Sequence, residues 1–233
     1  MDIPPGADSG PDGAPRTGAD PARARLDAAL VHRWIRQLDR RLHASEAHLT
    51  ELDAAIGDAD HGANMTRGIR AALTRVGDEA GASAAQLVAA VGHTFSRSVG
   101  GASGPLYGTW FSALGRTLPE DHDADPEELA AALVAALGAV QQLGAAEPGD
   151  KTMVDALGPA ARRALAAARA GADLAGTLRL AVGAAEDGAL ATVPLRARRG
   201  RASYLGARSE GHQDPGATSA AIVLDALRQA AGA

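Results

Sequence analysis

The chain has 233 residues, of which 46% are hydrophobic, 22% charged and 3% aromatic, and it contains no cysteine. This composition is typical of one globular domain, and the lack of cysteine excludes a disulfide scaffold, a thiolate zinc site and a cysteine nucleophile. The net charge of −5 gives no indication of a basic surface for nucleic acid. The sequence shows neither a signal peptide nor an apolar run of membrane-spanning length, so the chain is expected in the cytoplasm, away from membranes.

The N-terminal segment differs in composition from the rest of the chain. Residues 1–22 contain five prolines and four glycines among small and acidic residues. Such a segment buries too little apolar surface to offset the entropy lost on ordering, so it is predicted to be a disordered tail. Residues 23–233 are predicted to form one domain, long enough to bury about 70% of its unfolded surface.

Hydrophobic side chains recur at helical spacing along this domain. The first stripe has one every four residues: Leu26, Leu30, Trp34, Leu38 and Leu42. A second stripe, over 129–140, follows a proline and two glutamates that suit a helix start. Two more stripes lie over 157–165 and 174–182, the latter with Asp173 as its predicted N-cap. Further helices are predicted over about 64–79, 83–98, 104–117 and 217–231.

Signals for β-strands are missing from this sequence. No run of β-branched residues alternates with period two, and the best strand candidate, residues 192–195, contains a proline. The chain is therefore predicted to be all-α, with about eight helices. Functional groups are expected on four stretches rich in Gly, Asp, Ser, Pro and Arg between these helices: 50–68, 99–110, 144–155 and 196–219.

The first of these stretches carries three carboxylates within eight residues, at Asp53, Asp58 and Asp60. Brought together without a partner, they would repel and raise one another's pKa, and a hard divalent cation such as Mg²⁺ would remove that cost. The alternative interpretation is that Asp58 and Asp60 cap the next helix. An EF-hand is excluded, because Ile69 rather than a glutamate occupies the twelfth position counted from Asp58.

The second stretch, residues 100–109, contains four glycines and opens a predicted helix. Backbone N–H groups at such a helix start form a natural cradle for phosphate. Glycines at these positions would equally permit close packing of helices. This stretch alone therefore leaves both interpretations open.

The third stretch looks like a P-loop, beginning at Gly144 and ending in Asp150, Lys151 and a threonine. A P-loop follows a β-strand, whereas this stretch follows a predicted helix, so the P-loop interpretation is rejected. Lys151 is then expected to be a solvated loop charge, and Met153 a core side chain on the next helix.

The fourth stretch places four arginines within six positions: Arg196, Arg198, Arg199 and Arg201. They suit either a solvated surface or a phosphate site, since a guanidinium group binds phosphate oxygens in pairs. Further along, residues 214–216 (Asp-Pro-Gly) form a tight turn that starts the last helix.

In chain order, the strings LDAAIGDADHGANMTRG, GGASGPLYGT, GDKTMVDAL, GRASYLG and GHQDPGATS resemble the L subunit of dihydroxyacetone kinase, the nucleotide-binding half of that enzyme. The resemblance covers residues from about 26 to 230. It implies a closed barrel of eight antiparallel helices, with ADP or ATP and two Mg²⁺ ions bound at one end.

The resemblance also implies roles for individual residues. The metal ligands would be Asp53, Asp58 and Asp60. The nucleotide contacts would be His61, Gly62, Ala63, Asn64, Ala102, Ser103, Gly144, Met153, Arg201, Asp214, Pro215 and Gly216. Arg201 is in addition expected to be catalytic, because a guanidinium near phosphates helps most as charge develops during transfer.

A phosphoryl-transfer subunit without a sugar domain needs partners. The resemblance implies a K-type subunit that holds dihydroxyacetone and an M-type phosphocarrier of the phosphotransferase system that phosphorylates bound ADP. Two alternatives stay open: an ATP-dependent kinase subunit for dihydroxyacetone or a related sugar, and a nucleotide-sensing regulatory module without catalysis. A homodimer also stays open.

Overall fold

The computed structural model of this protein describes residues 24–77 and 81–233, which contain helices and no β-strand. The predicted tail, residues 1–22, lies outside the described residues. The α-helices are α1 (Ala28–Ile56), α2 (His61–Gly77), α3 (Ala84–Ser98), α4 (Ser103–Thr117), α5 (Pro126–Gly144), α6 (Val154–Arg169), α7 (Leu174–Ala191) and α8 (Pro215–Ala230). A 3₁₀ helix, η2 (Arg201–Ser209), lies between α7 and α8. The all-α prediction is confirmed.

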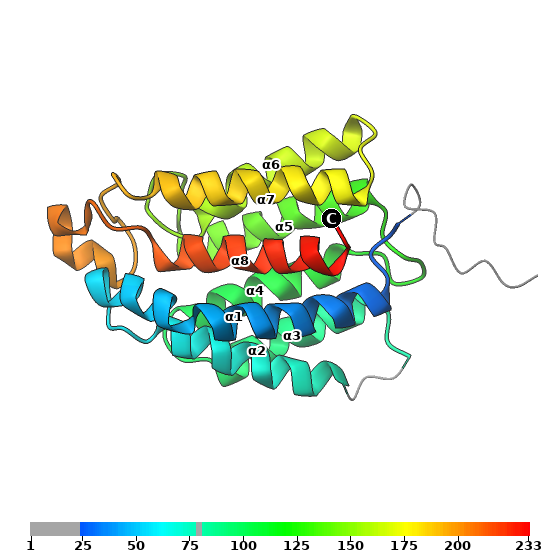
Figure 1. Cartoon of the computed structure of the whole chain (residues 1–233), viewed down its shortest axis with the longest axis horizontal. Coiled ribbons are helices and arrows are strands. Elements are labelled where there is room, and N and C mark those ends of the chain that lie inside the picture. The colour runs from blue at the N-terminus through cyan, green and yellow to red at the C-terminus, as the bar shows by residue number, and fades with distance from the viewer. Residues whose placement is uncertain (1–23, 78–80) are drawn as a thin grey trace, which may run out of the picture.

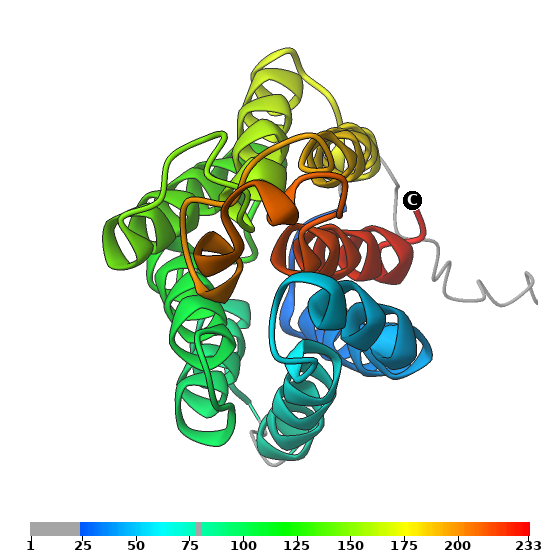
Figure 2. The ribbon, with the colours of Figure 1, turned by 90° about the vertical axis from the view of Figure 1, so that its left-hand side faces the viewer.

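The eight α-helices form a ring around one core. Each packs against the next in the chain, and α8 returns to pack against α1, so that the ring closes. Figures 1 and 2 show that neighbouring helices run in opposite directions and that η2 lies across one end of the ring. This arrangement agrees with the antiparallel barrel that the family resemblance implies. One consequence is that α2, α4, α6 and α8 all begin at the end covered by η2.

Side-chain caps define several helix starts. Asp173 accepts a hydrogen bond from the backbone N–H of Gly176 at the start of α7, which confirms it as an N-cap. Ser83 and Asp125 form capping boxes before α3 and α5. These caps place helix starts close to where the sequence predicts them, because each satisfies N–H groups that have no partner within the helix.

The first helix differs from its prediction at both ends. Leu26, assigned to the first helical stripe, lies before α1, where its backbone exchanges hydrogen bonds with Ala124. At the other end α1 continues to Ile56, so Asp53 lies on a helix and not in a loop. Only residues 57–60 connect α1 to α2, because the helix propagates through an alanine-rich sequence until Gly57 ends it.

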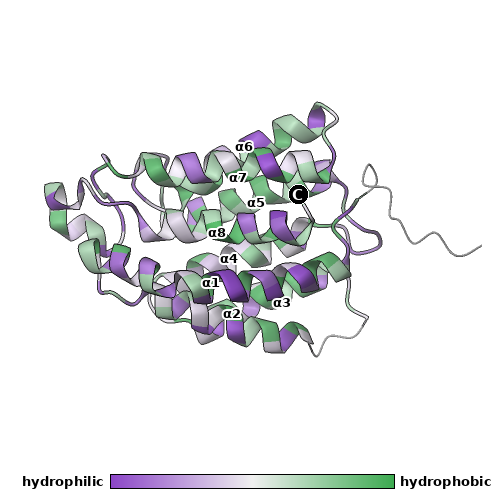
Figure 3. Ribbon diagram, viewed as in Figure 1, coloured by the Kyte–Doolittle hydropathy of each residue, from purple (hydrophilic) through white to green (hydrophobic). Residues whose placement is uncertain are grey.

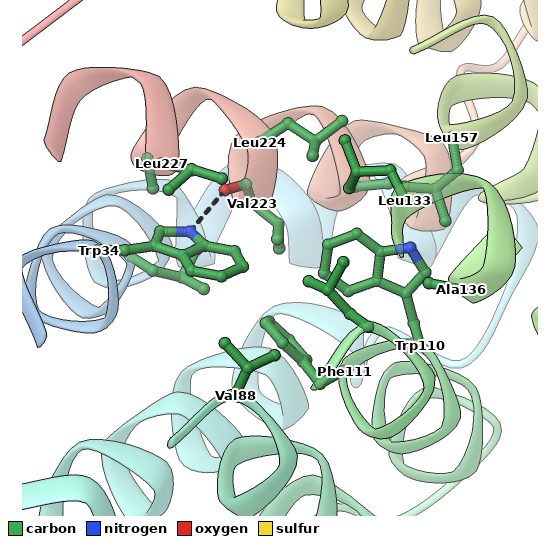
Figure 4. Close-up of a cluster of buried hydrophobic side chains, with 14 of the residues drawn as sticks. Trp34, Val88, Trp110, Phe111, Leu133, Ala136, Leu157, Val223, Leu224 and Leu227 are labelled. Carbon is green, nitrogen blue, oxygen red and sulfur yellow. Dashed lines mark hydrogen bonds between the residues drawn. The ribbon is translucent and has the colours of Figure 1, made fainter. Parts of the chain in front are cut away.

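Five of the six aromatic residues fill the interior of the ring, and the sixth, Tyr204, is exposed. Trp34 and Trp110 meet edge to face with ring centroids 6.5 Å apart, and Trp34 also contacts Phe111 at 5.6 Å. The indole N–H of Trp34 donates to the carbonyl oxygen of Val223 at 3.0 Å (Figure 4). This bond joins α1 to α8 inside the core, where an unpaired indole N–H would be costly.

Polar and apolar residues both occur along α1 (Figure 3), and its buried residues include Leu30, Trp34 and Leu38, which recur every four positions. This pattern belongs to helices that bury one face and leave the other in water. In the described part of the chain, no helix is both long enough and apolar enough to cross a membrane.

Candidate functional site

Three carboxylates converge at the end of the barrel that η2 covers. Asp53 lies near the C-terminal end of α1, and Asp58 and Asp60 lie in the connection to α2. One carboxylate oxygen from each lies within 4.8 Å of the others. Oxygen donors in such a cluster fit Mg²⁺, which removes the repulsion among them.

The backbone of the 57–60 connection brings the carboxylates together. Asp53 Oδ2 accepts hydrogen bonds from the backbone N–H groups of Asp60 at 2.9 Å and His61 at 3.1 Å. A Cβ on Gly57 would lie 2.1 Å from Asp53 Oδ1, so only glycine fits there. Ala59 adopts φ +62°, a left-handed conformation that is strained for alanine. Asp53, and not Asp58 or Asp60, therefore caps the first N–H of α2.

A cavity of about 430 Å³ opens beside the carboxylates. This volume suits a nucleotide-sized ligand. Its walls include apolar side chains from several helices, among them Ile56, Leu106, Val140, Leu143 and Val154. The apolar wall suits an aromatic base, and the part of the cavity beside the carboxylates suits a charged group with its metal ion.

Four helices begin at the cavity. Its lining includes His61, Ser103, Val154 and Pro215, the first residues of α2, α4, α6 and α8. The N-terminus of a helix carries partial positive charge and N–H groups without helical partners, which bind anions. The antiparallel ring gathers these N-termini at one end, so a polyphosphate there would meet donors from several helices.

A hydrogen-bonded chain of side chains links the cavity to the core. His61 Nδ1 contacts Ser103 Oγ at 3.0 Å, and His61 Nε2 contacts Ser219 Oγ at 2.8 Å. Ser219 in turn contacts the hydroxyl of Tyr107 at 2.6 Å. Burial lowers the pKa of His61 despite the nearby Asp53 and Asp60 charges, so the imidazole is held neutral.

Arg201 reaches the carboxylate cluster from η2. It begins η2, and its Nε lies 3.0 Å from Asp58 Oδ2, with the side chain 68% exposed. Arg199 also lines the cavity but pairs with Asp150 at 3.0 Å. Of the arginines in this stretch, Arg201 thus lies at the carboxylate cluster, whereas Arg199 is paired with Asp150 in the loop between α5 and α6.

The DAK2 domain profile matches residues 55–229 of this chain. The chain belongs to the DAK2 domain family. It is 37% identical over 206 residues to the PEP-dependent dihydroxyacetone kinase, ADP-binding subunit DhaL, of Escherichia coli (strain K12), a match that covers 88% of this chain and 98% of that protein.

Two larger proteins contain a region similar to this DAK2 domain. L-erythrulose 1-kinase of Mycolicibacterium smegmatis is 40% identical over 190 residues, covering 78% of this chain and 32% of that protein. The crystal structure of the dihydroxyacetone kinase from C. freundii in complex with AMP-PNP and Mg²⁺ matches with a TM-score of 0.66 and 28% identity, over 97% of this chain and 38% of that chain.

The DAK2 domain brings most of the predicted site residues to one cavity. Its lining includes Asp53, Asp58, Asp60, His61, Ala102, Ser103, Gly144, Met153, Arg201, Asp214, Pro215 and Gly216. Gly62, Ala63 and Asn64 do not line it. They lie in the first turn of α2, where a Cβ on Gly62 would come within 2.2 Å of the backbone oxygen of Glu46. Their predicted contact with a nucleotide stays a prediction.

Three residues of this region have positions that the sequence did not predict. Tyr107 lies four positions after Ser103 in α4, and Ser219 lies four positions after Pro215 in α8. Residues four apart share one face of a helix, and this spacing could have indicated both side chains. Lys151 was expected to be a solvated charge, and this is wrong: its side chain is 1% exposed. Its ammonium is satisfied by backbone carbonyls of other loops, which a local pattern does not show.

Stability of the DAK2 domain is expected to depend on the ionisation of Asp214. Burial raises the pKa of this carboxyl to about 7, and the N–H of Ala217 offsets the shift only in part. Because its folded pKa exceeds the unfolded value of 3.8, the charged form costs stability as pH rises toward 7. Asp214→Asn keeps an acceptor for Ala217 and carries no charge. From pH 5 to 8 the free energy of unfolding of the wild type should therefore fall relative to the variant by about 3 kcal/mol.

Urea unfolding of both proteins at several pH values, without nucleotide, measures this difference. Curves that stay parallel from pH 5 to 8 would show that Asp214 is ionised throughout.

Proposed function

We propose that this chain is the nucleotide-binding, phosphoryl-transfer subunit of a dihydroxyacetone kinase. It would hold ADP with Mg²⁺ between a phosphorylated carrier protein and dihydroxyacetone bound on a separate subunit. The observation that carries the proposal is the carboxylate cluster of Asp53, Asp58 and Asp60 at the mouth of a cavity that four helix N-termini share. The similarity to DhaL over nearly the whole of both chains supports it.

Two parts of the cavity would bind different parts of the nucleotide. Leu106, Val140 and Leu143 offer apolar contact to the base. The N-termini of α2 and α4, with Ala102 and Ser103, face the phosphates. Each end of the nucleotide thus meets the surface that suits its chemistry.

Asp53, Asp58 and Asp60 would hold two Mg²⁺ ions. Bound Mg²⁺ neutralises charge on phosphate oxygens and so lets a polyphosphate lie beside carboxylates that would otherwise repel it. Asp53 is itself fixed by two backbone N–H groups, so the first carboxylate is oriented before any ligand arrives. Arg201, exposed beside Asp58, would stabilise charge on the transferred phosphoryl group.

The proposed partners follow from what the cavity holds. It fits a nucleotide, and a K-type subunit would present dihydroxyacetone to it at the end of the barrel where η2 lies. An M-type carrier would use the same opening to deliver the phosphoryl group. A nucleotide that serves two partners in turn works best if it dissociates slowly, since affinity differences appear mainly in the dissociation rate.

The donor decides between this function and an ordinary kinase subunit. We expect the purified protein to release ADP on denaturation. Combined with a K-type subunit and dihydroxyacetone, it should turn over rapidly with a phosphorylated M-type carrier and poorly with free ATP. The measurement is dihydroxyacetone phosphate formed over time with each donor, with the K-type subunit alone as control.

Other outcomes would reassign the chain. Fast, saturable turnover with ATP alone would make it an ATP-dependent kinase subunit, the form suggested by its similarity to a region of L-erythrulose 1-kinase. Inactivity with both donors, despite bound nucleotide, would instead identify a regulatory module.

A further inference from the structure

Lys151 is the one lysine of this sequence, and it is buried next to the cavity. Its Nζ donates to the backbone oxygens of Thr192 at 2.8 Å and Leu195 at 3.0 Å, with a longer contact of 3.4 Å to Val193. It also donates to the backbone oxygen of His212. All four partners are carbonyl oxygens, which only accept, so the amine is the donor in every contact.

The four carbonyls belong to two segments that are distant in sequence from Lys151. Residues 192–195 follow the end of α7, and residue 212 precedes the turn that starts α8. Lys151 itself sits in the connection between α5 and α6, with φ +65°, a conformation rarely adopted by a residue other than glycine. Such a conformation persists only where surrounding contacts hold it, and the carbonyl contacts of the side chain do so here.

Each of the three tethered segments carries part of the proposed nucleotide site. Two residues after Lys151 is Met153, and two residues after His212 is Asp214, both of which line the cavity. The 192–195 segment leads directly to η2, which begins with Arg201. The buried ammonium is therefore the point where the segments that hold Met153, Asp214 and Arg201 meet.

Neighbouring contacts join these segments in pairs. The backbone oxygen of Asp150 accepts from Arg198 N at 3.0 Å, and its carboxylate pairs with Arg199. The N–H of Asp214 donates to Thr192 Oγ1 at 2.9 Å. Of these tethers, only Lys151 joins all three segments.

We propose that Lys151 is a positioning residue, whose buried ammonium holds three loops in the arrangement that binds the nucleotide. This rests on the proposed nucleotide-binding function. Because Nζ is occupied by backbone carbonyls, it acts through the loops and not by contact with phosphate. Burial lowers the pKa of Lys151, and the nearby carboxylates of Asp214 and Glu210 oppose this shift.

The test compares Lys151→Met with Lys151→Cys carrying an aminoethyl group. The natural chain has no cysteine, so alkylating the unfolded cysteine variant with bromoethylamine and refolding it restores an amine at this one position. We expect Lys151→Met to bind MgADP roughly tenfold or more weakly than wild type, because several hydrogen bonds to a charged donor are lost. The aminoethylated variant should recover most of the affinity. Titration calorimetry on the whole chain, freed of bound nucleotide by unfolding and refolding, measures both.

Asp225→Asn is the matched control. Asp225 is buried and pairs with Arg41 and Arg228, so its replacement also removes buried charge contacts. It lies ten residues along α8 from Pro215, about 15 Å from the cavity end. This variant should lose stability in urea but bind MgADP like wild type.

The outcomes separate the inference from the function on which it rests. Failure of the wild type to bind MgADP would overturn the proposed function. Wild-type binding together with unchanged binding by Lys151→Met, or with no recovery on aminoethylation, would overturn the positioning role. If circular dichroism shows that Lys151→Met is unfolded, Lys151→Gln replaces it, because glutamine keeps two N–H donors without the charge. The same two binding outcomes then decide the positioning role.

Discussion

Replacing Asp60 with asparagine is expected to weaken MgADP binding by at least roughly 100-fold, since changes even to residues outside a metal's ligand shell cost 10- to 100-fold in affinity. The substitution removes one charge from three carboxylates whose oxygens lie within 4.8 Å of one another. Asparagine is nearly the same size and leaves the backbone N–H of residue 60 free to donate to Asp53. Helix content should therefore stay unchanged while the dependence of binding on Mg²⁺ disappears.

Calorimetric titration of ADP into nucleotide-free protein at several Mg²⁺ concentrations measures this effect. Glu51→Gln is the matched control, because it removes one acidic charge from the exposed surface of the same helix, α1, outside the cavity lining. If Asp60→Asn binds nucleotide with the same Mg²⁺ dependence as Glu51→Gln, the carboxylates do not hold metal and the proposed function loses its main support.

Removal of the Arg201 guanidinium should slow phosphoryl transfer far more than it weakens nucleotide binding. The side chain is 68% exposed and rests on Asp58, so it adds little to the packing of the cavity. A positioned donor contributes most when charge develops in the transition state, and losing one costs roughly 100-fold in kcat. Arg201→Ala should accordingly show a kcat about 100-fold lower, with an affinity for MgADP within about threefold of wild type.

The assay for Arg201 uses the reconstituted system with a K-type subunit and the preferred donor. Arg208→Ala removes an exposed arginine from the same 3₁₀ helix, at a position outside the cavity lining, and should leave kcat unchanged. Equal rates for Arg201→Ala and Arg208→Ala would assign Arg201 to the solvated surface. A loss of affinity equal to the loss of kcat would make it a binding residue instead.

Much of the fold follows from local patterns in the sequence. The four-residue stripe that includes Trp34 and Leu38 forms one face of α1, and Asp173 caps α7 where the spacing places a helix start. These features depend on residues within one or two turns of each other, so the chain signals them locally. The ends of α1 were less predictable, because Leu26 is held by Ala124 and Gly57 ends the helix only after Asp53.

The sequence by itself determined that this chain is all-α and that Asp53, Asp58 and Asp60 form one candidate metal cluster, since helical periodicity and close carboxylate spacing are local properties. Only the tertiary structure decided how four distant stretches share one cavity, because closing an antiparallel ring brings the starts of α2, α4, α6 and α8 to the same end. It also decided where the side chain of Lys151 lies. A buried ammonium must find its acceptors, and here they lie on segments more than forty residues away along the chain, where no local pattern could reveal them.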